Sequence, residues 1–194
     1  MSTNAITLKQ NKIVPWLGLA ILLAGTAWLL HGQGRLWICS CGQVWLWAGD
    51  IWSSHNSQHL LDPYSFTHVL HGVLFYGLLV WLRPGLPLPW RLCLATLIEA
   101  AWEVVENSEF VIQRYRETTM ALGYEGDTIV NSLGDIVVCG LGFMLARQLG
   151  FRRSVIFFVA TELALLLWIR DSLILNVIML LYPIEGIKAW QVGG

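Results

Sequence analysis

The stretch LCLATLIEAAWEVVENSEFV, residues 92–111, has the length and apolar character of a membrane-crossing helix, yet it contains Glu99, Glu103 and Glu106. An ionisable side chain near the centre of such a helix costs at least ~2.5 kcal/mol. These groups are tolerated where they face one another, a water-filled cavity or a bound ion. The stretch therefore predicts a helix that lies inside a membrane bundle and lines a buried polar site.

The composition favours a membrane protein. Of the 194 residues, 56% are hydrophobic and 13% are charged, whereas a soluble domain has about 25% charged residues. The 11 Trp residues agree with this, because Trp concentrates at membrane–water interfaces. The net charge of −1 argues against a nucleic-acid partner. We predict one integral membrane domain, residues 1–194, whose partner is the lipid bilayer, and the oligomeric state stays open.

Five segments approach the ~20 apolar residues that cross a bilayer as a helix. They are residues 13–30, 65–82, 90–111, 127–149 and 154–169, the last followed by an apolar tail to residue 181. Residues 36–52 are rich in Trp but short, which predicts an interfacial or re-entrant segment rather than a sixth crossing. The predicted fold is an all-α, polytopic membrane bundle of about five transmembrane helices plus this Trp-rich segment.

The distribution of positive charge orients the predicted bundle. With five crossings, the more basic side receives Lys9, Lys12, Arg83, Arg91, Arg147, Arg152 and Arg153. The other side receives Arg35, Arg114, Arg116 and Lys188, with Arg170 near its edge. Because the more basic side is cytoplasmic, we predict a cytoplasmic N-terminus and an outer, periplasmic C-terminus.

Polar residues in the predicted helices fall on single faces, because side chains three or four positions apart share a face. The faces hold His68 and His71 in the second segment, Glu99, Glu103, Glu106 and Asn107 in the third, and Asp127, Asn131 and Asp135 in the fourth. In the predicted orientation these residues lie at similar depth near the outer side of the membrane. We expect them to meet in one cavity.

Imidazole and carboxylate groups together suit Zn²⁺, Mn²⁺ or Fe²⁺, and carboxylates alone suit Mg²⁺ or Ca²⁺. The candidate metal ligands are His68, His71, Glu103, Glu106 and Asp127, and the candidate catalytic residues are Glu103, Glu106 and Asp135. The candidate substrate-binding residues are Asn107, Asn131, Arg114, Arg116 and Arg170. Arginines there would hold an anionic group. This pattern predicts a metal-dependent hydrolase of a lipid-linked or periplasmic substrate, with a Glu as general base.

Several other interpretations stay open. His68 could hydrogen-bond Glu103 or Asp135 across the bundle for purely structural reasons, which would suit a non-catalytic assembly or scaffold protein. Buried acids and histidines also serve ion paths, as in a transporter or ion-binding protein.

The loop before the second segment contains two cysteines and two histidines. Cys39 and Cys41 could bind a soft metal, and His55 and His59 could extend a metal site. A packed turn for the cysteines and a solvated loop for His55 are the simpler interpretations. A disulfide across one residue would be strained.

The order of several motifs resembles that of one protein family. The motifs are Trp37-x-Cys39-x-Cys41-Gly42, Asn56-Ser57-Gln58-His59, His68-x-x-His71-Gly72, Glu99-Ala100-Ala101-Trp102-Glu103-x-x-Glu106-Asn107, Arg114-Tyr115-Arg116 and Gly126-Asp127-x-x-x-Asn131. They are similar to those of small, uncharacterised multi-pass inner-membrane proteins, mostly from alphaproteobacteria. The resemblance covers nearly the whole chain. It implies a bacterial plasma-membrane location and no particular activity.

Overall fold

In a computed structural model of the chain, residues 13–119, 121 and 123–193 are described, and this part is helical without strands. The helices are α1 (Val14–Gly32), α2 (Ser65–Leu82), α3 (Leu88–Glu106), α4 (Glu109–Thr118), α5 (Ile129–Ile169), α6 (Leu173–Leu181) and α7 (Glu185–Gln191). The predicted all-α class is confirmed. The basic N-terminal residues Lys9 and Lys12 lie outside the described residues.

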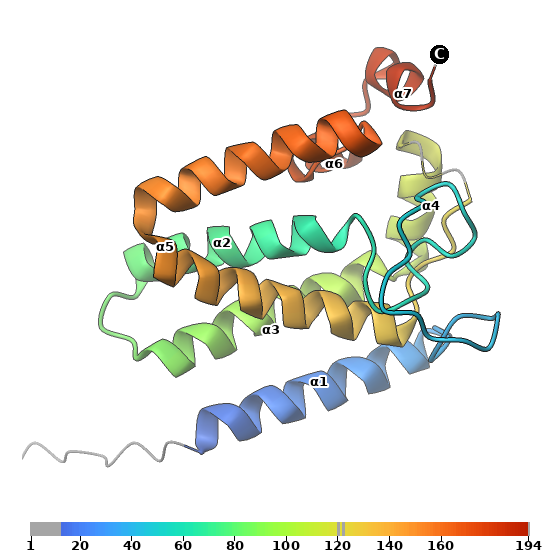
Figure 1. The fold of residues 1–194 in the computed structure, drawn as a ribbon. Coiled ribbons are helices and arrows are strands. Elements are labelled where there is room, and N and C mark those ends of the chain that lie inside the picture. Colours follow the sequence, from blue (N-terminus) through green and yellow to red (C-terminus); the bar gives the residue numbers. More distant parts are fainter. Residues whose placement is uncertain (1–12, 120, 122, 194) are drawn as a thin grey trace, which may run out of the picture.

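The helix α5 is a hairpin of two arms. Gly150 is its non-helical residue, with φ 72° and ψ 173°, a backbone conformation that Gly adopts readily because it has no Cβ. Figure 1 shows the first arm running beside α2 and α3 and the second arm returning in the opposite direction. The helices α1, α2 and α3 and the two arms of α5 therefore form a bundle of roughly parallel and antiparallel rods.

The number of apolar crossing helices is three rather than the predicted five. Among the described residues, α1, α2 and α5 are long and apolar enough to cross a membrane. The predicted fourth and fifth segments are the two arms of one 41-residue helix. The helix α3 has 19 residues but carries Arg91 and three glutamates, which lower its hydropathy. The predicted second segment, by contrast, has the bounds of α2, Ser65–Leu82.

Local capping explains two further differences from the predicted boundaries. The helix α3 ends at Glu106, and Ser108 begins α4 by accepting a hydrogen bond from the Val111 N–H at 3.4 Å. The predicted third segment is therefore too long. The hydroxyl of Thr128 accepts from the Asn131 N–H at 3.3 Å and starts α5 two residues later than predicted.

Residues 33–64 form a segment without helix or strand that folds over one end of the bundle (Figure 1), and we call it the capping loop. The N–H of Ile129, at the start of α5, donates to the Leu36 carbonyl at 2.8 Å. Within the loop, the Ala48 N–H donates to the Leu61 carbonyl at 2.9 Å. The Trp-rich residues 36–52 belong to this loop and contain no helix, so they do not form a sixth crossing helix.

Two glycines bring the backbones of α2 and α5 together. A Cβ on Gly72 would lie 1.9 Å from the Cys139 carbonyl oxygen, and a Cβ on Gly142 would lie 2.1 Å from that of Val69. Neither position has room for a side chain, and small residues allow this kind of close helix contact in membrane bundles. The contact carries His68 of α2 close to Asp135, the acid in the first arm of α5.

The close crossing predicts a stability effect. We expect Gly72→Ala to lower the free energy of unfolding by about 1–3 kcal/mol, because the added methyl group must push α2 away from α5. Thermal unfolding of the detergent-solubilised protein measures it. Gly77→Ala on the same helix is the control, since a Cβ at Gly77 meets nothing within 4 Å. Equal melting temperatures for the two variants would show that the crossing is not tightly packed.

Candidate metal centre

Two histidines of α2 share one glutamate of α3. His68 Nδ1 lies 2.5 Å from Glu99 Oε1, and His71 Nδ1 lies 2.9 Å from Glu99 Oε2. Glu99 is fully buried. It lay on the predicted polar face of the third segment but not among the predicted ligands. Its spacing of four from Glu103 was the sequence signal for it.

Glu103 is a buried carboxylate without a donor. It has no exposed surface, and neither of its side-chain oxygens has a hydrogen-bond partner within the described part of the chain. His68 Nδ1 lies 3.4 Å from Glu103 Oε1, while His68 Nε2 lies 3.9 Å from Asp135 Oδ2. A buried carboxylate without hydrogen bonds is costly unless a proton or a cation neutralises it.

Asp127 joins the same group from the residues just before α5. It accepts hydrogen bonds from Asn107 Nδ2 at 2.9 Å and from the Tyr124 hydroxyl at 2.8 Å. The Asn107 side-chain oxygen in turn accepts from the Asp127 N–H at 2.7 Å. Burial raises the pKa of the Asp127 carboxyl. Asn107, a predicted substrate-binding residue, thus holds Asp127 in place in this structure.

The donor atoms form three overlapping sets, each of which could hold a metal ion. The sets are His68–His71–Glu99, His68–Glu103–Asp135 and Glu103–Glu106–Asp127, with donor atoms within 4.8 Å of one another in each. They share His68 and Glu103, so they form one continuous row. All five predicted metal ligands and Asp135 belong to it. Metal binding itself stays a prediction.

A cavity of about 90 Å³ lies beside this row, large enough for several water molecules or ions. His68, His71, Glu106, Asp127, Asn131 and Asp135 line it. Its walls come from the first turns of α2 and α5, the last turns of α3, and from α4, α6 and the capping loop. No Lys or Arg is among the described residues that line it. Its acids therefore lack permanent positive partners at the cavity wall.

The three predicted arginines do not line the cavity. Arg114 Nε donates to the Leu180 carbonyl at 2.9 Å, and Arg116 Nε donates to the Tyr124 carbonyl. Arg170 Nη1 donates to the Trp190 carbonyl at 3.0 Å, near the C-terminus. Each guanidinium group thus bonds a backbone carbonyl, and binding of a substrate by these arginines stays a prediction.

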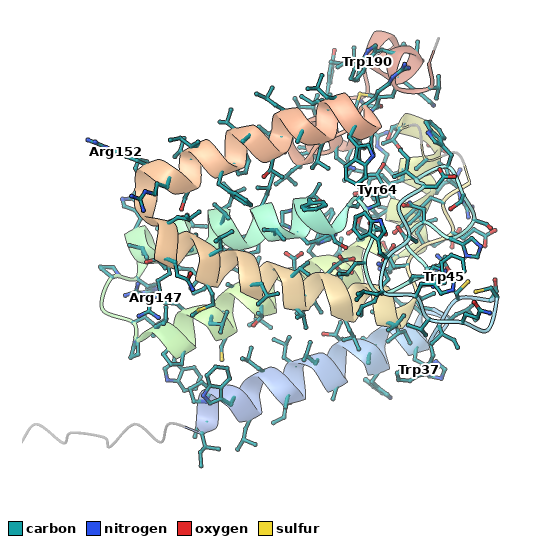
Figure 2. The ribbon with its side chains drawn as sticks, in the orientation of Figure 1. Trp37, Trp45, Tyr64, Arg147, Arg152 and Trp190 are labelled. Atoms are coloured by element: carbon teal, nitrogen blue, oxygen red, sulfur yellow. The ribbon has the colours of Figure 1, made fainter. Side chains whose placement is uncertain are left out.

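Several residues that line the cavity were not predicted as site residues. They include Asp62, Tyr115, Tyr124 and Asp171. The Tyr64 hydroxyl donates to Asp171 Oδ2 at 3.3 Å. Tyr64 lies close to the second arm of α5 in Figure 2. These residues sit in turns and in the short helix α4, where no helical periodicity relates them to the polar faces of the long helices.

Glu162, the acid in the second arm of α5, has a structural role. Its two carboxylate oxygens accept hydrogen bonds from the backbone N–H groups of Leu173 at 2.9 Å and Ile174 at 3.1 Å. These N–H groups belong to the first turn of α6, where helix N–H groups lack partners within the helix. Glu162 thus joins α6 to α5 and does not line the cavity.

The fold and the site define an all-helical protein with apolar helices of membrane-crossing length and an internal acidic cavity. The chain belongs to the family described as "Protein of unknown function (DUF2585)", which matches residues 30–193. The predicted resemblance to an uncharacterised alphaproteobacterial family is thereby confirmed.

Individual relatives match most of the chain. A UPF0314 protein of Rhizobium meliloti (strain 1021) is 48% identical over 187 residues, which cover 95% of this chain and 94% of the relative. A UPF0314 protein of Paracoccus denitrificans is 47% identical and covers 98% of each chain. Another, from Sphingopyxis alaskensis, is 46% identical and covers 92% of this chain and 95% of its own. No solved structure matches the chain.

Asp171 gives the cavity wall a predictable pH dependence. Burial raises the pKa of its carboxyl to about 6, whereas an unperturbed Asp has a pKa of about 3.9. The folded chain therefore holds this proton more tightly, and the free energy of unfolding falls as the pH rises through 6. We expect this group to contribute a loss of about 1 kcal/mol between pH 5 and pH 7. Denaturant unfolding in detergent at several pH values measures the loss.

Two variants test this assignment. Asp171→Asn keeps a polar side chain of similar size and should flatten the pH profile. Asp50→Asn changes an exposed residue of the capping loop and should keep the wild-type profile. A profile for Asp171→Asn that matches wild type would mean that another group titrates.

Proposed function

We propose that this chain is a multi-pass protein of the bacterial inner membrane in which α3 and both arms of α5 cross together with α1 and α2. The helix α3 has 19 residues, as many as α1, and about 1.5 Å of rise per residue gives each a length close to the ~30 Å core. Glu99 and Glu103 of α3 are fully buried. Because these two acids of α3 do not face lipid, they do not oppose insertion of the helix into the membrane.

The ends of the bundle support one orientation. Arg147 and Arg152 lie at the opposite end from Trp37 and Trp45 of the capping loop (Figure 2). By the positive-inside rule the arginine end is cytoplasmic. The capping loop and the cavity are then periplasmic, the N-terminus is cytoplasmic and the C-terminus is periplasmic.

The cavity serves, in this proposal, as a divalent metal centre. The supporting observation is the buried Glu103 carboxylate, which has no hydrogen-bond donor among residues 13–119, 121 and 123–193 and lies in a row of five carboxylates and two imidazoles. If both histidines are protonated, the negative charges of the five carboxylates still outnumber the positive charges of the two imidazoles. A divalent cation would offset this surplus and coordinate the carboxylate oxygens. The mixture of imidazole and carboxylate donors favours Zn²⁺, Mn²⁺ or Fe²⁺ over Mg²⁺ or Ca²⁺.

Hydrolysis of a lipid-linked or periplasmic substrate is the activity that this centre supports best. A divalent cation there would acidify water and polarise an ester or phosphate group. Glu106 lines the cavity, and its Oε2 has no hydrogen-bond partner within the described residues, so it can accept a proton from water. The hydroxyl oxygens of Tyr115 and Tyr124, on the same wall, can accept hydrogen bonds from a bound substrate.

The extent of the cavity lining supports a site near one end of the bundle rather than a transport path through it. On α2 the lining residues run from Thr67 to His71, and on α5 they run from Asn131 to Asp135. In the described part of the chain the polar lining thus stops well before the arginine end. A transporter would need a polar route that becomes accessible from both sides.

Metal analysis of the purified protein tests the centre. We expect wild-type protein to retain at least one more equivalent of divalent metal than Glu103→Gln, because the amide cannot offset the charge of a cation. Glu109→Gln, in an exposed glutamate of α4, is the matched control and should bind as wild type does. Equal metal content in all three proteins, with unaltered stability in chelator, would remove the metal centre and favour a structural role for the polar row.

Activity is tested separately on metal-loaded protein. We expect the wild type to release water-soluble products from a bacterial membrane lipid extract, detected by mass spectrometry. Glu106→Gln should lower this rate about 100-fold or more, because it removes the general base, while Glu109→Gln should not. Protein that binds metal without any turnover, but moves the ion across proteoliposome membranes, would establish the transporter instead.

A further inference from the structure

The capping loop is long for a segment without regular structure. It runs over residues 33–64, whereas loops above about 12–15 residues without secondary structure are uncommon in compact domains unless they are functional. Yet it buries polar side chains, among them His59 at 1% exposure and Asp62 at 2%. An additional link would explain how such a loop keeps one conformation over the cavity.

Two cysteines and two histidines of this loop converge. Cys39 Sγ lies 3.8 Å from His55 Nδ1, and His55 Nδ1 lies 3.0 Å from His59 Nε2. One donor atom from each of Cys39, Cys41, His55 and His59 lies within 4.8 Å of all the others. All four are separate from the acidic row, which lies on α2, α3 and the start of α5.

We propose that these four residues bind one structural Zn²⁺ ion, which fastens the capping loop over the cavity. Two thiolates and two imidazoles are a common ligand set of structural zinc sites, and oxygen-preferring Mg²⁺ and Ca²⁺ do not use it. The usual Zn–S and Zn–N lengths, about 2.3 and 2.0–2.1 Å, place tetrahedral ligands about 3.6 Å apart for S–N and about 3.3 Å for N–N. The observed 3.8 and 3.0 Å require little adjustment.

The surroundings of the four residues suit a bound cation with thiolate ligands. The Cys41 N–H donates to Cys39 Sγ at 3.3 Å, a contact that stabilises negative charge on the sulfur. The indole of Trp45 packs on both imidazoles, with ring centroids 4.4 Å from His55 and 4.2 Å from His59. Cys39 is buried and Cys41 is exposed. Metal can therefore enter from the Cys41 side.

Hydrogen bonding distinguishes the two histidines. The Trp45 N–H donates to His59 Nδ1 at 3.1 Å, so the proton of a neutral His59 lies on Nε2 and points to His55 Nδ1. His55 Nδ1 thus presents a lone pair, as a ligand must. His59 can coordinate through Nε2 only after its ring or its proton moves away from this arrangement. Cys39, Cys41 and His55 are therefore the primary ligands, and His59 completes the site when metal binds.

The site would also influence the cavity. Asn56, Ser57 and Asp62 line the cavity and belong to the same loop as the four ligands. The Ser57 N–H donates to Asp62 Oδ2 at 2.9 Å. A metal bound next to this turn holds the cavity wall without contacting the acidic row. The proposal does not depend on the function of that row.

Cobalt substitution tests the site in the full-length protein in detergent. We expect Co²⁺ to give thiolate-to-cobalt charge-transfer absorption and the intense visible bands of tetrahedral cobalt, and Zn²⁺ to displace it. Cys39→Ser and Cys41→Ser each remove one of the two thiolates. Each should therefore lower the charge-transfer absorption per bound Co²⁺ and weaken Co²⁺ binding at least about 100-fold, more than the loss of a residue that only hydrogen-bonds a ligand costs. His55→Asn should weaken binding more than His59→Asn. Cys93→Ser and Cys139→Ser, in the other two cysteines, should leave the spectrum unchanged.

Alkylation of wild-type protein provides a test that does not require folded variants. Bound Zn²⁺ should protect Cys39 and Cys41 from iodoacetamide at least about 10-fold, with protection lost in chelator, as peptide mass spectrometry reports. Cys93 and Cys139 should react equally with and without Zn²⁺. A Co²⁺ spectrum without thiolate bands, or cysteines at 39 and 41 that are unprotected or joined in a disulfide, would overturn the proposal.

Discussion

The constraint on which the structure depends is the burial of excess negative charge. Glu99 is matched by two imidazoles, whereas the buried Glu103 has no donor in the part of the chain that the structure describes. Glu106, Asp127 and Asp135 lie close by. Carboxylates in such a place repel one another strongly unless protons or a cation are present. The helices that carry them can pack together only with that compensation, so the ionic content of the cavity and the stability of the bundle are linked.

The backbone is shaped to hold these acids in one place. Gly72 and Gly142 allow α2 and α5 to touch, and Gly150 turns α5 back along the bundle. The hydroxyls of Ser108 and Thr128 accept backbone hydrogen bonds where α4 and α5 begin. Each of these residues is small or polar. Together they decide where the polar faces meet.

The two groups of potential metal ligands differ in chemistry and in place. The inner row offers carboxylates and imidazoles at the cavity, donors that suit a cation with open coordination positions. The capping loop offers two thiols and two imidazoles, with the indole of Trp45 stacked on His59. Four protein ligands fill all the positions of a tetrahedral ion, as in structural zinc sites. The loop contributes Asn56, Ser57 and Asp62 to the cavity wall. The conformation of the loop thus bears directly on the inner row.

The sequence alone determined the helical class, the bounds of α2 and the polar faces of α2, α3 and α5, because helical periodicity is a local property. It also predicted that His68 would face acids of other helices, although Glu99 rather than Glu103 is its closest partner. The end of α3 at Glu106 depended on the Ser108 cap. The apolar spans numbered three because α3 is too charged and because the predicted fourth and fifth segments are the two arms of α5.

Only the tertiary structure decided which distant residues share a site. It brought Tyr64 and Asp171 together and directed the Arg114 and Arg170 side chains to backbone carbonyls. It also gathered Cys39 and His55 in a loop that has no periodicity of its own. Contacts between loops depend on how the whole chain packs, and spacing along the sequence carries little information about them.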